Sequence, residues 1–227
     1  MKIRITLLLF LFIKLCFAQN VVFNKIETTF PNTDKFLYKI KNGNPEAKFL
    51  AEIEVQGYSN DHVDTFKKIV AKAKEVGANA FAYQPFLKID MNENHFDLAN
   101  FKINLYHLDK NLFPDTNNQV VLIASANKDQ KLSWNKEKIL LKENSFVKLK
   151  MLPGEIYTLS TRNLFGSSVK ISYNNDQQIQ YFLISAFKVK SDKSGVGGLN
   201  LKSGDIISID SSFGDYLTLV LQNNDNQ

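Results

Sequence analysis

The chain is poor in the residues that build disulfide frameworks, metal centres and thiol chemistry. Its 227 residues include one cysteine, Cys16, three histidines and one tryptophan. One cysteine cannot form an intramolecular disulfide or a thiolate cluster for zinc. No apolar run reaches the roughly 20 residues that a membrane-spanning helix needs. We therefore expect the mature chain to lack a transmembrane span and to owe its stability to buried apolar side chains.

The first 18 residues have the layout of a secretory signal. Lys2 and Arg4 precede the apolar run Leu7–Ile13, and the small residue Ala18 marks the expected cleavage point. We interpret residues 1–18 as a signal peptide. The sequence thus predicts an exported protein that is periplasmic or associated with the bacterial cell envelope.

Removal of the signal changes the charge and the cysteine count. Residues 1–18 hold three of the 28 basic side chains and none of the 23 acidic ones, so the mature chain has a formal charge of +2. Such a balance gives no electrostatic footprint for nucleic acid. Cleavage after Ala18 also removes Cys16. Lipid attachment at Cys16 is disfavoured, because Leu15 stands where a lipoprotein signal has a small residue.

Residues 48–76 predict a strand followed by a helix. Residues 48–57 alternate between apolar and polar side chains, which is typical of a half-buried strand. Residues 61–76 then carry one continuous apolar stripe, which is typical of an amphipathic helix. The stripe consists of Val63, Phe66, Ile69, Val70, Ala73 and Val76. Asn60 or Asp61 can cap the start of this helix, and Gly77 stands where a helix end often needs a positive φ.

Four lysines lie mainly off the apolar stripe of this helix. They are Lys67, Lys68, Lys72 and Lys74. We interpret them as a solvated outer face rather than an anion-binding patch, because acidic neighbours and the low mature charge argue against a patch.

The residues after the helix predict a tight turn and two more strands. Gly77–Ala80 are small, so the chain can turn back beneath the helix. Phe81 begins a strand that Pro85 places at a sheet edge or bulge. Residues 91–95 are expected to form a turn, and 96–108 a returning strand. The order is β-α-β-β, with one helix on a small sheet.

The segment AKEVGANAFAY resembles the A-x-x-x-G-A-N-A pattern of small domains in bacterial envelope proteins. It is similar to the YbjQ-like family and to the domain of the Rcs envelope-stress sensor lipoprotein. The matching residues are Ala73 and Gly77–Ala80, with Glu52–Gly57 as the preceding strand. The resemblance implies a small β-α-β-β domain of the envelope. It transfers no functional residue, because this chain has neither a visible metal cluster nor the sensor's cysteines.

The second half predicts an all-β module, so the fold class is α+β with a sandwich or barrel at its end. The expected strands are 119–126, 137–142, 145–152, 155–161, 168–173, 178–190, 205–210 and 215–221. A further strand is expected at 34–41, before the turn at Asn42–Pro45. The domain boundaries follow: signal peptide 1–18, α+β module 19–111, linker 112–118, all-β module 119–222 and disordered tail 223–227.

Motifs for catalysis or metal binding are weak. His62, His95 and His107 fall in separate elements, although His95 and Asp97 could share a hairpin end with His107; we interpret all three histidines as separate surface groups. Phe165–Ser168 is the nearest sequence to a nucleophile elbow, and Gly195–Gly198 the nearest to a phosphate loop. Neither is followed by the helix that such a motif requires.

Carboxylate pairs and aromatic side chains leave two further possibilities open. Asp90 with Glu93, or Glu137 with Glu143, could in principle supply acid–base chemistry. An aromatic groove for sugar or peptidoglycan could be lined by Phe86, Tyr106, Trp134, Tyr157, Tyr173, Tyr181 and Tyr216. Most of these rings are expected to serve as core or cross-strand pairs.

The main hypothesis is therefore an exported envelope protein of non-enzymatic binding type. Its partner would be an envelope protein or a cell-wall component, bound by strand addition at a sheet edge. The alternative is a glycan- or peptide-acting hydrolase with carboxylates at the junction of the modules. A lipid-carrying β module is a third possibility. No catalytic residue, metal ligand or cofactor is predicted.

Overall fold

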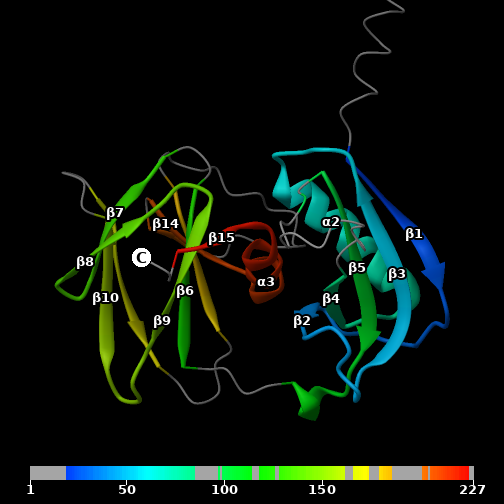
Figure 1. Ribbon diagram of the computed structural model, residues 1–227. Helices are drawn as coiled ribbons and strands as arrows, with labels where there is room; N and C mark the ends of the chain where they lie inside the picture. The colour runs from blue at the N-terminus through cyan, green and yellow to red at the C-terminus, as the bar shows by residue number, and fades with distance from the viewer. Residues whose placement is uncertain are drawn as a thin grey trace, which may run out of the picture. The chain divides into compact units, whose positions relative to one another are not determined.

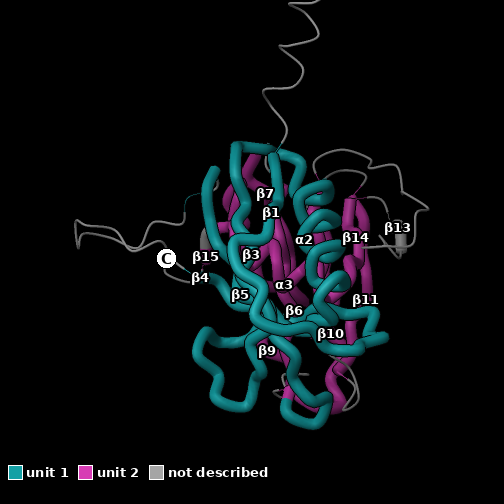
Figure 2. The backbone as a smooth tube through the Cα atoms, turned by 90° about the vertical axis from the view of Figure 1, so that its right-hand side faces the viewer, with its two compact units in different colours: residues 1–112 teal, residues 113–227 magenta. Residues whose placement is uncertain are grey.

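The chain folds into two compact units, residues 1–112 and 113–227 (Figure 2). The computed structural model describes residues 19–84, 97, 99–113, 118–125, 128–161, 166–173, 179–185, 201–203 and 205–224. The expected signal peptide, with Cys16, lies outside the described residues. The first unit places one helix on a sheet and the second is rich in strands, which confirms the α+β class with a sandwich-like β region.

The first unit contains a five-stranded sheet in the order β1-β3-β5-β4-β2. Its strands are β1 (Asn20–Ile26), β2 (Tyr38–Lys39), β3 (Lys48–Gln56), β4 (Ala80–Gln84) and β5 (Asn100–His107). The predicted strands 48–57 and 96–108 correspond to β3 and β5. The sequence prediction missed β1, and only two residues of the expected strand 34–41 pair in the sheet. The expected turn 91–95 and Pro85 lie outside the described residues.

Helix α2 (His62–Val76) covers one face of this sheet (Figure 1). The side chain of Asp61 caps it by accepting a hydrogen bond from Asp64 N at 2.9 Å. Gly77 ends it in the left-handed conformation, with φ of 76°. The apolar stripe is buried except for Val63, which is 42% exposed, whereas the neighbouring Thr65 is buried at 1% exposure. The short 3₁₀ helix η1 (Lys110–Leu112) ends the unit.

The second unit is a sandwich of a four-stranded and a six-stranded sheet, in the orders β11-β10-β7-β8 and β13-β14-β12-β6-β9-β15. The strands are β6 (Gln119–Ala124), β7 (Gln130–Trp134), β8 (Glu137–Leu141), β9 (Ser145–Lys150), β10 (Ile156–Thr161), β11 (Ser168–Ser172), β12 (Gln180–Ile184), β13 (Leu201–Ser203), β14 (Ile206–Ile209) and β15 (Gln222–Asn223). Apolar side chains from both sheets form one core between them, including Leu122, Trp134, Leu159 and Phe182.

The prediction of a strand at 215–221 was wrong, because these residues belong almost entirely to helix α3 (Ser211–Val220). Asp210 caps α3 by accepting a hydrogen bond from Ser212 N at 2.9 Å. The buried positions of the helix repeat at helical spacing; among them are Phe213, Tyr216, Leu217 and Val220. Apolar and polar residues also alternate in DYLTLVL, and this alternation led to the prediction of a strand. Strands β7, β13 and β15 were not predicted.

No helix in the described part of the chain has the length and apolar character that crossing a membrane requires.

Candidate functional site

The turn after α2 is built around a glycine that no other residue can replace without a clash. A Cβ atom on Gly77 would lie 1.6 Å from the carbonyl oxygen of Phe30. The backbone of Phe30 is held there by its own N–H, which donates to Val76 O at 2.9 Å. The loop 27–37 therefore lies directly against the end of the helix. This contact explains why glycine follows the amphipathic stripe.

Asn79, the third residue of the Gly-Ala-Asn-Ala turn, joins three segments of the first unit. Its side chain is 1% exposed. Nδ2 donates to Leu108 O at 2.8 Å and to Asp34 Oδ2 at 3.0 Å, and Oδ1 accepts from Leu108 N at 2.9 Å. The backbone N–H of Asn79 donates to Tyr106 O at 3.0 Å. Asn79 therefore ties the loop before β2 to the end of β5, which is a structural role.

A pocket of 340 Å³ lies beside this asparagine, lined by Pro31–Asp34, Asn79 and His107–Lys110. Lys110 Nζ lies 2.7 Å from Asp34 Oδ1. The Asp34 side chain is 15% exposed, whereas that of Lys110 is 81% exposed. A hydrogen bond from Lys110 and a second from Asn79 hold the pKa of Asp34 below its ordinary value. The same ion pair raises the pKa of Lys110.

These pKa directions limit what the pocket can do chemically. A general acid or base works best with a pKa near the operating pH. The ion pair moves the pKa values of both groups away from neutral pH. Asp34 therefore becomes a weaker base and Lys110 a weaker acid. The pocket therefore presents a fixed ion pair, which suits structure or ligand contact better than proton transfer.

The histidines that the structure describes lie in separate places. The ring of His107 stacks on Phe30, with centroids 3.8 Å apart and planes at 24°, and its Nε2 lies 3.9 Å from Asp109 Oδ1. His62 opens α2, and burial lowers its pKa. His95 lies outside the described residues, so its expected place beside His107 is not described. Among the described residues, no group of three His, Cys, Asp or Glu side chains is placed to hold a metal ion.

Ser167, from the sequence that came nearest to a nucleophile elbow, is held in a structural network. Its Oγ accepts a hydrogen bond from Asp205 N at 3.0 Å. Its backbone N–H donates to Thr161 Oγ1 at 2.9 Å, and Thr161 Oγ1 donates to Asp205 Oδ2 at 3.3 Å. The strand β11 follows Ser167, not a helix. Gly195–Gly198 lies outside the described residues.

The carboxylate pairs gain no support as acid–base pairs. Glu137 opens β8 and Glu143 follows its end. A strand rises about 3.3 Å per residue, so β8 alone separates the backbones of these two residues by about 13 Å. The paired carboxyl groups of glycosidases lie about 5–9.5 Å apart. Asp90 and Glu93 lie outside the described residues.

The aromatic side chains proposed for a groove are mostly buried. Exposure is 6% for Tyr106 and Trp134, 7% for Tyr157, 3% for Tyr181 and 1% for Tyr216. Trp134 stacks on Tyr157 with centroids 4.8 Å apart. Tyr173 packs against the core of the second unit. Phe86 lies outside the described residues. The described rings thus serve the cores of the two units rather than a binding platform.

Strand β1 forms one edge of the sheet in the first unit. Within the described residues, β1 pairs only with β3, in antiparallel register. Val22 and Ile26 on this strand are 41% and 53% exposed. A register shift between Phe23 and Lys25 makes a bulge, so the regular part of the edge is Asn20–Phe23.

The other sheet edges are shorter. The terminal strands β2 and β15 have two residues each, and β13 has three. The terminal strands β8 and β11 have five. Short edge strands protect a sheet against pairing with another chain. The sequence pattern did not predict β1, although Val21, Val22 and Phe23 are residue types that favour a strand.

Comparison of the chain with protein-family models, curated proteins and solved structures finds no match. The resemblance of Gly77–Ala80 to small envelope domains therefore stays a prediction.

Proposed function

We propose that the chain is an exported bacterial cell-envelope protein that binds a partner without catalysis, by strand addition at β1. The observation that supports this most strongly is the seven-residue edge of the first sheet, which pairs on one side only among the described residues. An unpaired edge offers a row of backbone N–H and C=O groups to an extended segment of another chain. The geometry of the described residues offers no comparable support for hydrolysis.

Side chains on β1 indicate what kind of segment would fit. Val21 and Phe23 are half-buried, and Val22 on the opposite face is 41% exposed. An added strand would cover apolar surface on both faces of the edge, at about 25 cal/mol per Å² removed from water. The partner segment is therefore an extended peptide with aliphatic side chains that pair with Asn20–Phe23. The bulge after Phe23 ends this register.

Cysteine cross-linking tests this proposal sharply, because the mature chain that begins at residue 19 has no cysteine of its own. Val22→Cys, placed on the edge, should cross-link to a defined envelope component. It should also cross-link to an extended aliphatic peptide that is added to compete with this component. Ile156→Cys is the matched control, since Ile156 is an exposed aliphatic residue (65%) of the second unit.

Substitution of an edge residue by a charged one then tests how strongly the same edge binds its partner. Val22→Lys should weaken capture of the cross-linked component at least tenfold, whereas Ile156→Lys should not. Equal cross-linking at both cysteines, or equal loss with both lysines, would rule out β1 as the binding edge.

A further inference from the structure

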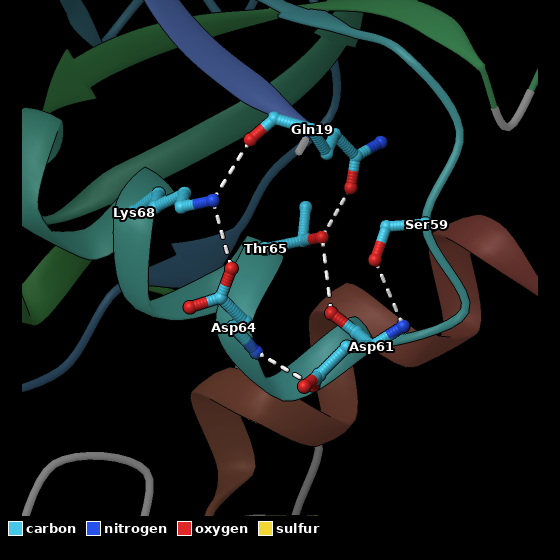
Figure 3. Close-up of polar contacts among 6 residues, drawn as sticks. All are labelled: Gln19, Ser59, Asp61, Asp64, Thr65 and Lys68. Atoms are coloured by element: carbon cyan, nitrogen blue, oxygen red, sulfur yellow. Dashed lines mark hydrogen bonds and ion pairs between the residues drawn. The ribbon is translucent and has the colours of Figure 1, made fainter. Parts of the chain in front are cut away.

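Gln19, the residue before β1, is almost completely buried. Its exposure is 4%, although the following residue, Asn20, is exposed. Its hydrogen-bond partners Thr65 and Lys68 belong to α2 and lie 46 and 49 residues further along the chain (Figure 3). The position matters because Gln19 becomes the first residue of the mature chain if the signal is cleaved after Ala18.

Two side chains of α2 hold Gln19. The hydroxyl of Thr65 donates to Oε1 of the Gln19 side chain, and it also lies 3.1 Å from Asp61 O. Lys68 Nζ donates to the backbone carbonyl of Gln19 at 2.8 Å, and the same Nζ lies 2.8 Å from Asp64 Oδ2 (Figure 3). Both oxygens of Gln19 are thus bound by hydrogen-bond donors of the helix.

A free α-ammonium group at this position would be unfavourable. It would belong to a buried residue, where loss of water disfavours the charged form. It would also lie on the same residue as the carbonyl that Lys68 binds, and a neighbouring like charge favours the neutral amine. Asp64 offsets part of the charge of Lys68 but is itself exposed, with 54% of its side chain accessible.

We infer that Gln19 is a modification site at which the mature chain closes to an N-terminal pyroglutamyl ring. In this reaction the neutral α-amine attacks Cδ of its own side chain. A bond forms between the α-nitrogen and Cδ, the bond between Cδ and Nε2 breaks, a proton passes from the α-nitrogen to Nε2, and ammonia leaves. No oxidant or second substrate is needed. The inference rests on the signal cleavage in the proposed function.

The contacts around Gln19 suit this reaction and its product. A hydroxyl that donates to Oε1 stabilises the negative charge that develops on this oxygen during attack. The ring keeps Oε1, so it keeps the acceptor for Thr65, and it keeps the backbone carbonyl that Lys68 binds. The product has no terminal charge to bury beside Lys68. Thr65 is therefore a positioning residue for ring closure.

The first experiment starts from mature chain with an open Gln19, released from a fusion by a protease that leaves this residue first. Ring closure is followed by intact mass, which falls by the mass of one ammonia. The folded protein should close completely on incubation. Thr65→Val, which removes the hydroxyl and keeps the branched shape, should close about tenfold more slowly. Thr65→Ser should restore the rate.

Urea-denatured chains provide the matched control, because Thr65 is not held near Gln19 there. Denatured wild type and denatured Thr65→Val should close at one common rate. If folded wild type and folded Thr65→Val also share one rate, or if the open form persists in the folded wild type, the inference is overturned.

The second experiment examines protein exported from cells with its own signal. Its first residue should be blocked to stepwise degradation and should have the mass of the pyroglutamyl form. A chain that begins at Gln19 with an open amide would contradict ring closure alone. A chain that still carries residues 1–18 would contradict export. In that case the protein released from the fusion would still show whether Gln19 closes to the pyroglutamyl ring.

Discussion

The two α-helices that the described residues form, α2 and α3, differ in what the glycine at or within each helix contacts. Helix α2 has 15 residues, an aspartate cap at one end and a left-handed glycine at the other, and its glycine touches the backbone of a loop. Helix α3 has ten residues, and its Gly214 lies within the helix against the ring of Tyr181. A Cβ added at Gly77 would clash with backbone atoms, and no side-chain movement can relieve that clash. A Cβ added at Gly214 would clash with the ring of Tyr181, and the ring can move aside. The first unit should therefore tolerate less change at its glycine than the second.

Gly77→Ala should produce the largest loss of stability. The new Cβ would lie 1.6 Å from Phe30 O, and φ at this position is 76°. We expect a cost above about 3 kcal/mol, because backbone strain and a backbone clash act together. Hydrogen exchange in peptides of β3 and β5 measures the loss in the first unit.

Gly43→Ala is the matched control for Gly77→Ala. Its φ of 73° is nearly the same, but a Cβ there would have no atom within 4 Å. The strained conformation alone costs about 1–2 kcal/mol. Similar losses for both variants would show that the contact with Phe30 contributes nothing.

Gly214→Ala should destabilise the second unit by a smaller amount. A Cβ there would lie 2.2 Å from Cγ of Tyr181, and overpacking of this kind costs about 1–3 kcal/mol. Alanine also favours the helix by about 1 kcal/mol relative to glycine, which offsets part of the cost. The single tryptophan, Trp134, lies in this unit, so its fluorescence in urea reports the change.

A double-mutant cycle sharpens the result at Gly214. In a Tyr181→Ala background, where the ring is absent, Gly214→Ala should become neutral or stabilising. If Gly214→Ala loses the same stability in both backgrounds, contact with the Tyr181 ring is not the cause of the loss.

Asp34→Asn should have the smallest effect, and the effect should depend on pH. The pKa of Asp34 in the folded protein lies below its ordinary value of 3.8, first because of the hydrogen bond from Lys110. The ionised group therefore stabilises the first unit fully above this value, and the contribution is lost as the pH falls through the folded pKa. The variant should show a flatter decline of stability between pH 5 and pH 2, measured by urea unfolding.

Asp109→Asn is the control for Asp34→Asn, since the Asp109 side chain is 77% exposed. It should leave the dependence on pH unchanged. A wild-type slope in Asp34→Asn would mean that the ion pair with Lys110 does not stabilise the fold.

The sequence predicted the elements whose signals are local. The apolar stripe, Asp61 and Gly77 specified α2, and alternation specified β3 and most strands of the sandwich. It failed for α3, because DYLTLVL satisfies both an alternating and a helical spacing over so short a stretch. It also missed the roles of Asn79 and Gln19, since hydrogen bonds across 29 and 46 residues leave no periodic trace.

By itself, then, the sequence determined the α+β class, the position of α2 and the strand-rich second half, because side-chain period and capping act within a few residues. Only the tertiary structure decided that β1 forms a sheet edge, that α3 is helical and that Gln19 meets Thr65. These outcomes depend on which distant segments pair and pack, and the free energy of such contacts exists only once the chain has brought the segments together.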